Sequence, residues 1–97
     1  MQLVTGPQRE RKVLYRPPFS AEWQELDLDT AMDMIADRVL DARRKGWQDA
    51  DEDGNTLRRT MGVASLGGAT LDNEENYLIK KLFTALGAIQ IENQARI

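Results

Sequence analysis

Three aspartates at alternating positions, Asp49, Asp51 and Asp53, are followed directly by Gly54, a spacing that could serve cation binding. In a calcium loop of the EF-hand type, alternating side-chain oxygens point at the ion and a glycine makes the sharp turn. The last position of such a loop requires a bidentate glutamate, and Thr60 occupies it here. The residues that follow favour a strand rather than an exiting helix. We therefore expect a solvated hairpin turn, of type I′ at Asp53-Gly54, with weak cation binding by the three aspartates as the alternative.

A second candidate is the pair Gly67-Gly68, which lies between a predicted strand and a predicted helix. This is where α/β proteins bind phosphates, at the carboxyl end of a strand and the N-terminus of the next helix. The full G-x-G-x-x-G pattern is absent, and the charges of Glu74 and Glu75 in the first turn would repel an anion. These glutamates point about 100° apart, so they do not form an acid/base pair. Both a tight structural turn and a cofactor contact remain open for the two glycines.

The composition excludes several kinds of site within these 97 residues, which contain no cysteine and no histidine. Zinc sites of the usual type, cysteine-ligated iron–sulfur clusters and Ser-His-Asp or Cys-His catalysis all need these residues. A net charge of −3, from 13 basic and 16 acidic residues, argues against a nucleic-acid-binding face. No run of apolar residues is long enough to span a membrane, and the N-terminus lacks the apolar region of a signal peptide.

The elements that must position these residues follow from periodicity and end signals. A helix over 28–45 begins at Asp27 or Asp29 and ends at Gly46, with one apolar face made by residues at helical spacing: Leu28, Ala31, Met32, Ile35, Val39 and Ala42. A hairpin loop over 48–60 comes next.

A strand over 61–66, a helix over 73–86 and a strand over 88–92 complete the chain, and such a crossover implies a parallel pair. Residues 1–26 are expected to form an extended arm and connector with one short strand, and residues 27–97 a partial α/β domain. The predicted fold class is α/β, as a fragment of a three-layer αβα domain. Its open sheet edges predict self-association of the isolated chain.

Residues 67–77 (GGATLDNEENY), followed by Ala95-Arg96-Ile97, resemble the catalytic (alpha) subunit of molybdenum- or tungsten-dependent formate dehydrogenases. That family carries a small-residue turn with an N-E-E-x-Y-like stretch after a strand, and an A-R-[IV] tripeptide further on. Residues 12–17 (KVLYRP) are similar to the segment that follows the family's N-terminal iron–sulfur module, and residues 28–36 to the helix after it. The resemblance covers nearly the whole chain.

The resemblance implies formate oxidation to CO₂, or its reversal, at Mo or W held by two molybdopterin guanine dinucleotides, with electrons leaving through a [4Fe–4S] cluster. The residues that would face the cofactor are Gly67, Gly68, Gln94 and Arg96. The implied partners are the rest of the catalytic subunit and its electron-transfer subunits, with no nucleic acid and no membrane span. We expect this chain to bind none of the cofactors by itself and to be inactive alone.

In that family, the residue after A-R-[IV] is the selenocysteine or cysteine that ligates the metal. We therefore expect Ile97 to precede a UGA codon in the source DNA, and any other triplet there would refute this expectation. The alternative function is a small stand-alone binding or interaction module with a weak cation-binding acidic loop. Calorimetry with Ca²⁺ separates the two, because micromolar binding favours the module.

Overall fold

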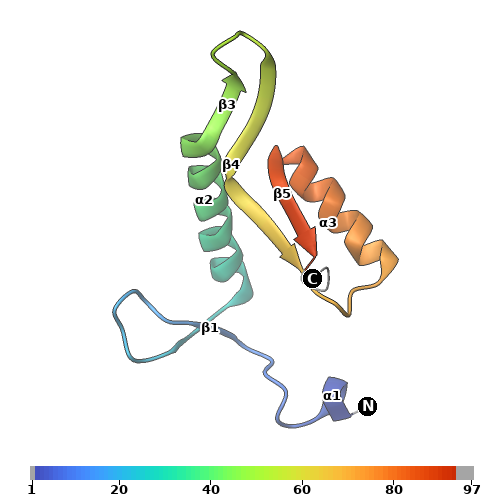
Figure 1. Ribbon diagram of the computed structural model, residues 1–97. Coiled ribbons are helices and arrows are strands. Elements are labelled where there is room, and N and C mark those ends of the chain that lie inside the picture. Colours follow the sequence, from blue (N-terminus) through green and yellow to red (C-terminus); the bar gives the residue numbers. More distant parts are fainter. Residues whose placement is uncertain (1, 94–97) are drawn as a thin grey trace. The chain divides into compact units, whose positions relative to one another are not determined.

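The computed structural model describes residues 2–93, which form two compact units, Met1–Asp37 and Arg38–Ile97 (Figure 1). The boundary between the units falls inside helix α2 (Leu28–Gly46), whereas the sequence placed a boundary before that helix. No helix among residues 2–93 is long and apolar enough to cross a membrane.

The first unit contains a short helix, α1 (Gln2–Thr5), and a two-stranded sheet. Strands β1 (Val13–Tyr15) and β2 (Gln24–Leu26) pair antiparallel, with Val13 opposite Leu26 and Tyr15 opposite Gln24. From the sequence we expected an irregular arm and an extended connector here, so helix α1 and strand β2 are additional elements. The prolines between the strands cannot continue a strand. The chain therefore reverses direction, and the returning segment finds β1 as its partner.

Helix α2 begins where the sequence placed one of its two possible starts. The Asp27 side chain accepts hydrogen bonds from the Thr30 backbone N–H (3.0 Å) and the Thr30 hydroxyl (2.7 Å), so Asp27 is the N-cap. These bonds satisfy donors that the first helical turn leaves free, and they lower the pKa of the Asp27 carboxyl. Three basic residues occupy the last turn and favour the helix dipole.

The second unit is built on a three-stranded sheet with the order β3-β4-β5. Its strands are β3 (Trp47–Ala50), β4 (Thr56–Gly67) and β5 (Ala88–Asn93). Strands β3 and β4 form an antiparallel hairpin, and β4 and β5 are parallel, joined through helix α3 (Asn73–Ala85). The mixed α/β fold, with a parallel pair, a crossover helix and a hairpin, confirms the predicted fold class.

Strand β4 begins before the predicted strand 61–66, and β3 and β4 together take in most of the predicted loop 48–60. In β3 (WQDA) and in the first residues of β4 (TLRRT), apolar and polar side chains do not alternate, so no strand period marks these segments. The turn also differs, because only Gly54 in it has a positive φ (83°). A type I′ turn needs positive φ at both central residues, so that prediction was wrong. The turn is closed by the Gly54 N–H on the Asp51 carbonyl (3.1 Å) and the Asp51 N–H on the Asn55 carbonyl (3.0 Å).

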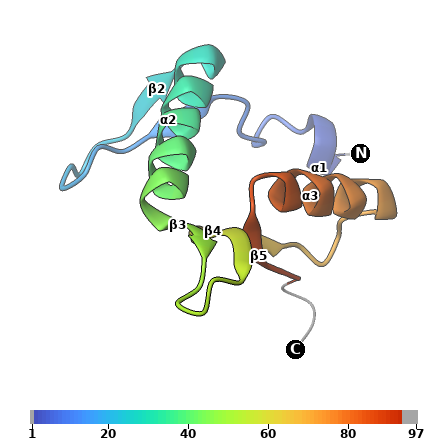
Figure 2. The same cartoon turned by 90° about the horizontal axis from the view of Figure 1, so that it is seen from above.

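The apolar residues of the second unit are largely uncovered. Helix α3 lies on one side of the β4–β5 pair (Figure 2), with Ile79, Phe83 and Leu86 half-buried. Residues on its outer side are 57–63% exposed: Tyr77, Leu78 and Leu82. In the sheet, Leu66 is 73% exposed. Among the residues described, the buried ones are Ala31, Ala88 and Thr60. A unit with so small a core presents surfaces that need covering.

Candidate functional site

The candidate site is the turn that follows β4, where two parallel strands end side by side. Gly67 pairs with Asn93, the last residue of β5, and the Asn93 side-chain amide donates a hydrogen bond to the Gly68 carbonyl (3.3 Å). The structure therefore brings Gly67 and Gly68 to the carboxyl edge of the sheet, where open α/β sheets bind ligands. Gln94 and Arg96, also predicted to face a cofactor, lie outside the described residues.

Neither glycine is required by the backbone conformation or by the packing of residues 2–93. Neither lies in the left-handed region of φ, where Gly54 and Gly87 do. A Cβ added at Gly67 would lie 3.5 Å from the Glu92 carbonyl oxygen, and one at Gly68 would lie 3.7 Å from Leu71 Cγ. These are ordinary van der Waals distances. The two bare positions therefore leave space at the strand ends that a side chain could fill without strain.

The start of α3 beside this turn is occupied by its own side chains. Asp72 is the N-cap and accepts a bond from the Glu75 N–H (2.8 Å), while the Glu75 carboxylate accepts one from the Asp72 N–H (3.1 Å). The Asn76 amide donates to the Asp72 carbonyl (2.9 Å). This capping box satisfies free donors of the helix and adds negative charge. The first turn of α3 is thus suited to starting the helix, not to holding a phosphate.

A cluster at the opposite end of α3 fixes the strand–helix–strand unit. The Arg43 guanidinium donates from Nε to the Leu86 carbonyl (2.9 Å) and lies 4.2 Å from the centroid of the Trp47 ring. Gly87, with φ 86°, accepts a bond from the Thr60 N–H on its carbonyl (2.8 Å). The end of α2, strands β3 and β4 and the C-terminus of α3 therefore meet at one point. Sequence reasoning assigned Arg43 and Gly87 only to helix ends and did not find this cluster.

The three aspartates of the acidic loop are not gathered around a common point. The Asp49 carboxylate accepts a bond from the Trp47 indole N–H (2.8 Å). The Asp51 carboxylate accepts from the Asn55 amide (2.9 Å), the Asn55 N–H (2.8 Å) and the Asp53 N–H (3.0 Å). These bonds, that of the Asn55 amide first, lower the pKa of Asp51.

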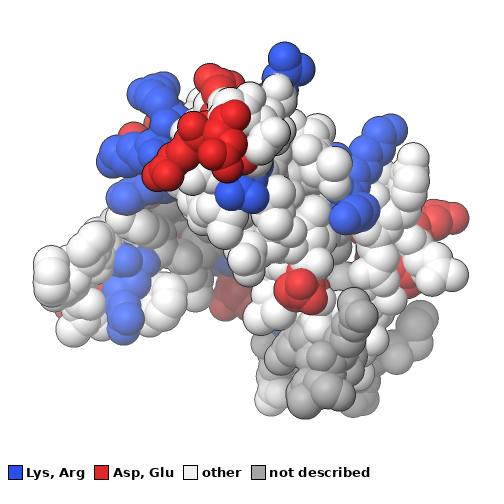
Figure 3. Space-filling model, turned by 45° about the horizontal axis from the view of Figure 1, so that its top comes forward, with Lys and Arg blue, Asp and Glu red and all other residues white. Residues whose placement is uncertain are grey.

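In the part of the chain that is described, no group of three or more Asp, Glu, His or Cys residues is arranged to hold a metal ion. In Figure 3 the largest group of acidic side chains lies near the top of the view, with basic side chains beside it. The geometry therefore gives the cation-binding alternative no support.

No protein-family profile matches the chain. Comparison with individual proteins finds relatives that are all subunits of formate dehydrogenases. It is 38% identical over 96 residues, 99% of its length, to the formate dehydrogenase subunit alpha of Megalodesulfovibrio gigas. It is 36% identical over 95 residues, 98% of its length, to the formate dehydrogenase 2 subunit alpha (cytochrome c-553) of Nitratidesulfovibrio vulgaris. A third relative is the formate dehydrogenase-O major subunit of Escherichia coli, 32% identical over 83 residues, 86% of this chain.

The chain spans 10%, 9% and 8% of these three proteins, respectively, so the matched part is about a tenth of each relative. The match includes the turn at Gly67-Gly68 and both elements that flank it, since it covers nearly all of the present sequence.

Proposed function

Because this chain is homologous, along nearly its whole length, to one segment of the alpha or major subunits of formate dehydrogenases, we propose that it serves as that segment of such a catalytic subunit. The observation that carries the proposal is 38% identity over 96 residues, without restriction to one motif. The named relatives are oxidoreductases that act on formate. The function proposed for this chain is to supply a strand–helix–strand unit to the same reaction.

The residues at the carboxyl edge of the sheet fit a large cofactor such as a bis-molybdopterin guanine dinucleotide complex of Mo or W. Such a cofactor supplies the two-electron oxidation of formate when it is bound. Gly67 and Gly68 would let it approach the backbone, because a Cβ at either position would extend into space that this chain does not fill. Asn93 would hold the carbonyl of Gly68 in place through its amide. Gln94 and Arg96, which follow β5, would provide further contacts.

The chain is proposed to be inactive by itself. It contains no cysteine that could hold a [4Fe–4S] cluster and no histidine, so electron transfer would depend on groups supplied by the rest of the subunit and by electron-transfer subunits. Assay of the purified chain for formate-dependent dye reduction tests this point. No turnover is expected, and turnover would contradict the proposal.

The partners proposed for the exposed surfaces are the other parts of the subunit. On α3 these surfaces include Tyr77, Leu78 and Leu82, which are 57–63% exposed. In the isolated chain the same residues favour self-association, because apolar patches left in water attract one another. Sedimentation velocity at increasing concentration should show larger species, and a monomer throughout would count against it.

A hybrid subunit tests the function itself. In the Megalodesulfovibrio gigas subunit, the matched segment is replaced by the corresponding 96 residues of this chain, and the hybrid is purified with its cofactors. We expect formate-dependent dye reduction above that of a hybrid carrying the same segment in scrambled order. A folded, cofactor-loaded hybrid without activity would refute the proposed function.

A further inference from the structure

The β1–β2 hairpin turns apolar side chains towards solvent. Leu14 and Trp23 lie on one face of the hairpin and are 44% and 62% exposed, and Phe19 in the connecting loop is completely exposed. The half-buried residues Val13 and Tyr15 alternate with Leu14 and belong to the other face. Two strands of three residues each are too small to be stable in water by themselves. A hairpin with aromatic residues on its open face therefore needs a partner surface.

The loop holds Phe19 in a conformation that favours this outward position. Phe19 has φ 63°, in the left-handed region that a bulky side chain rarely adopts. The preceding Pro17 accepts a hydrogen bond on its carbonyl from the Ser20 N–H (3.1 Å), and the Ser20 hydroxyl accepts one from the Glu22 N–H (3.1 Å). Proline restricts the backbone before the turn. The loop is thus shaped before binding, which reduces the entropic cost of binding.

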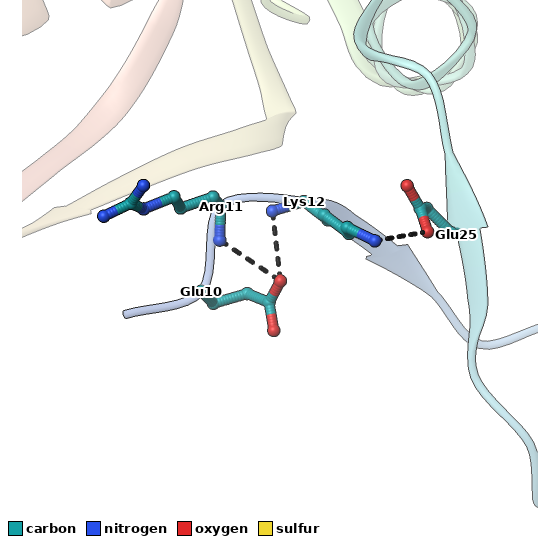
Figure 4. A network of polar contacts seen from close by, with 4 residues as sticks. All are labelled: Glu10, Arg11, Lys12 and Glu25. Atoms are coloured by element: carbon teal, nitrogen blue, oxygen red, sulfur yellow. Dashed lines mark hydrogen bonds and ion pairs between the residues drawn. The ribbon is translucent and has the colours of Figure 1, made fainter. Parts of the chain in front are cut away.

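Charged side chains frame the open face of the hairpin. The Arg16 guanidinium lies 5.4 Å from the centroid of the Trp23 ring. The Lys12 ammonium contacts the Glu25 carboxylate (3.2 Å), and the backbone N–H of Lys12 donates to the Glu10 carboxylate (3.0 Å), as Figure 4 shows. Aromatic residues and arginine surrounded by a polar rim are typical of the central residues of protein interfaces.

We propose that the β1–β2 hairpin is a docking element, whose Phe19 and Trp23 side chains insert into an apolar pocket formed by another part of the same catalytic polypeptide. This rests on the proposed function. The Megalodesulfovibrio gigas subunit is about ten times as long as the matched segment, which makes up 10% of it. The rest of such a polypeptide is covalently linked to the hairpin and is therefore present at high effective concentration. A separate subunit and a second copy of this chain are the competing occupants.

Hydrogen–deuterium exchange on the hybrid subunit described above tests the inference, with mass spectrometry of peptides covering residues 13–26. In the free chain we expect the backbone amides of this region to exchange fast. In the hybrid subunit, purified without other subunits, we expect them to exchange slowly. Phe19→Gly removes the side chain and suits the positive φ, so the hairpin keeps its conformation. In the hybrid this variant should exchange about tenfold faster or more, because burial of a phenylalanine side chain shifts an equilibrium by at least that factor. Leu3→Ala, which removes an apolar side chain that is 91% exposed outside the hairpin, is the matched control and should change nothing.

The other outcomes can be told apart, and all but the last of them overturn the inference. Protection that appears only after the electron-transfer subunits are added assigns the hairpin to a separate subunit. Protection that increases with the concentration of the free chain assigns it to a second copy. An active hybrid whose hairpin exchanges fast, or is unaffected by Phe19→Gly, refutes the docking element and leaves the proposed function intact. If the hybrid is folded but inactive, and its hairpin exchanges slowly unless Phe19 is replaced, the proposed function is refuted. The contact between the hairpin and the rest of the polypeptide is then still supported.

Discussion

Gly87 is the residue at which a single methyl group should disturb the second unit most. Its φ is 86°, and a Cβ there would lie 2.7 Å from Cζ3 of Trp47. Gly54 offers a matched control, because its φ is 83° and an added Cβ would meet nothing within 4 Å. Gly87→Ala and Gly54→Ala therefore share the conformational cost of a side chain at positive φ, and they differ in the collision with the indole ring.

The magnitudes follow from these two contributions. An alanine in the left-handed region costs about 1–2 kcal/mol, which is the whole loss of unfolding free energy expected for Gly54→Ala. Overpacking against a ring held in place adds about 1–3 kcal/mol, so Gly87→Ala should lose about 2–5 kcal/mol. The ring cannot move freely, because Arg43 lies against it and the Trp47 indole N–H is bonded to Asp49.

Urea unfolding measured by circular dichroism gives both losses, and Trp47 fluorescence in a Trp23→Phe background reports on the cluster itself. The Trp47→Leu background should remove most of the difference between the two glycine variants, since the colliding ring is gone. Equal losses for Gly87→Ala and Gly54→Ala in the unmodified chain would refute the close contact between Gly87 and Trp47.

Three further predictions concern single side chains. Arg58 sits at a bulge of β4 with φ 48°, so Arg58→Gly should raise the unfolding free energy by about 1 kcal/mol, and a loss in urea unfolding would contradict this. Asp72→Ala removes the cap that bonds the Glu75 N–H and should cost about 1 kcal/mol with reduced helicity; unchanged urea and helicity measurements would refute the role of the cap. The folded-state pKa of Asp51 is lowered from 3.8, chiefly by the Asn55 amide, so its contribution to stability is present above the unfolded pKa and is lost as the pH falls through the folded value. An NMR titration should place its midpoint below 3.8 and higher in Asn55→Ala, whereas coincident midpoints in the two proteins would exclude the amide as the cause.

The long helices and the parallel pair could be predicted from the sequence, because their signals are local. Helix α2 spans Leu28–Gly46 where 28–45 was expected, and α3 spans Asn73–Ala85 where 73–86 was expected. The short strands β2 and β3 could not be predicted, because their residues are mostly exposed and carry no alternation of apolar and polar side chains. Such segments become strands because a neighbouring strand is available to form hydrogen bonds with them.

The candidate site, too, could be predicted from the sequence only in part. The position of Gly67-Gly68 at the end of a strand followed from the local pattern, and the structure adds Asn93 as the residue that holds the turn. The hydrogen bond between Arg43 and Leu86 joins residues that are 43 positions apart. No pattern in the sequence near either residue predicts this contact. In the sequence, Arg43 was interpreted only as a basic residue near a helix end, and Leu86 only as an apolar residue before a glycine.

The central claim is that Gly67 and Gly68 are bare because a cofactor supplied by the rest of the subunit approaches them, and Gly68→Ala tests it most directly. In the free chain the new Cβ would meet no atom closer than 3.7 Å, so the unfolding free energy should stay within about 0.5 kcal/mol of the unchanged chain. In the active hybrid subunit the same methyl group should lower kcat/KM for formate about tenfold or more, since small displacements of a bound reactive group are costly. Full activity of the Gly68→Ala hybrid would contradict the claim.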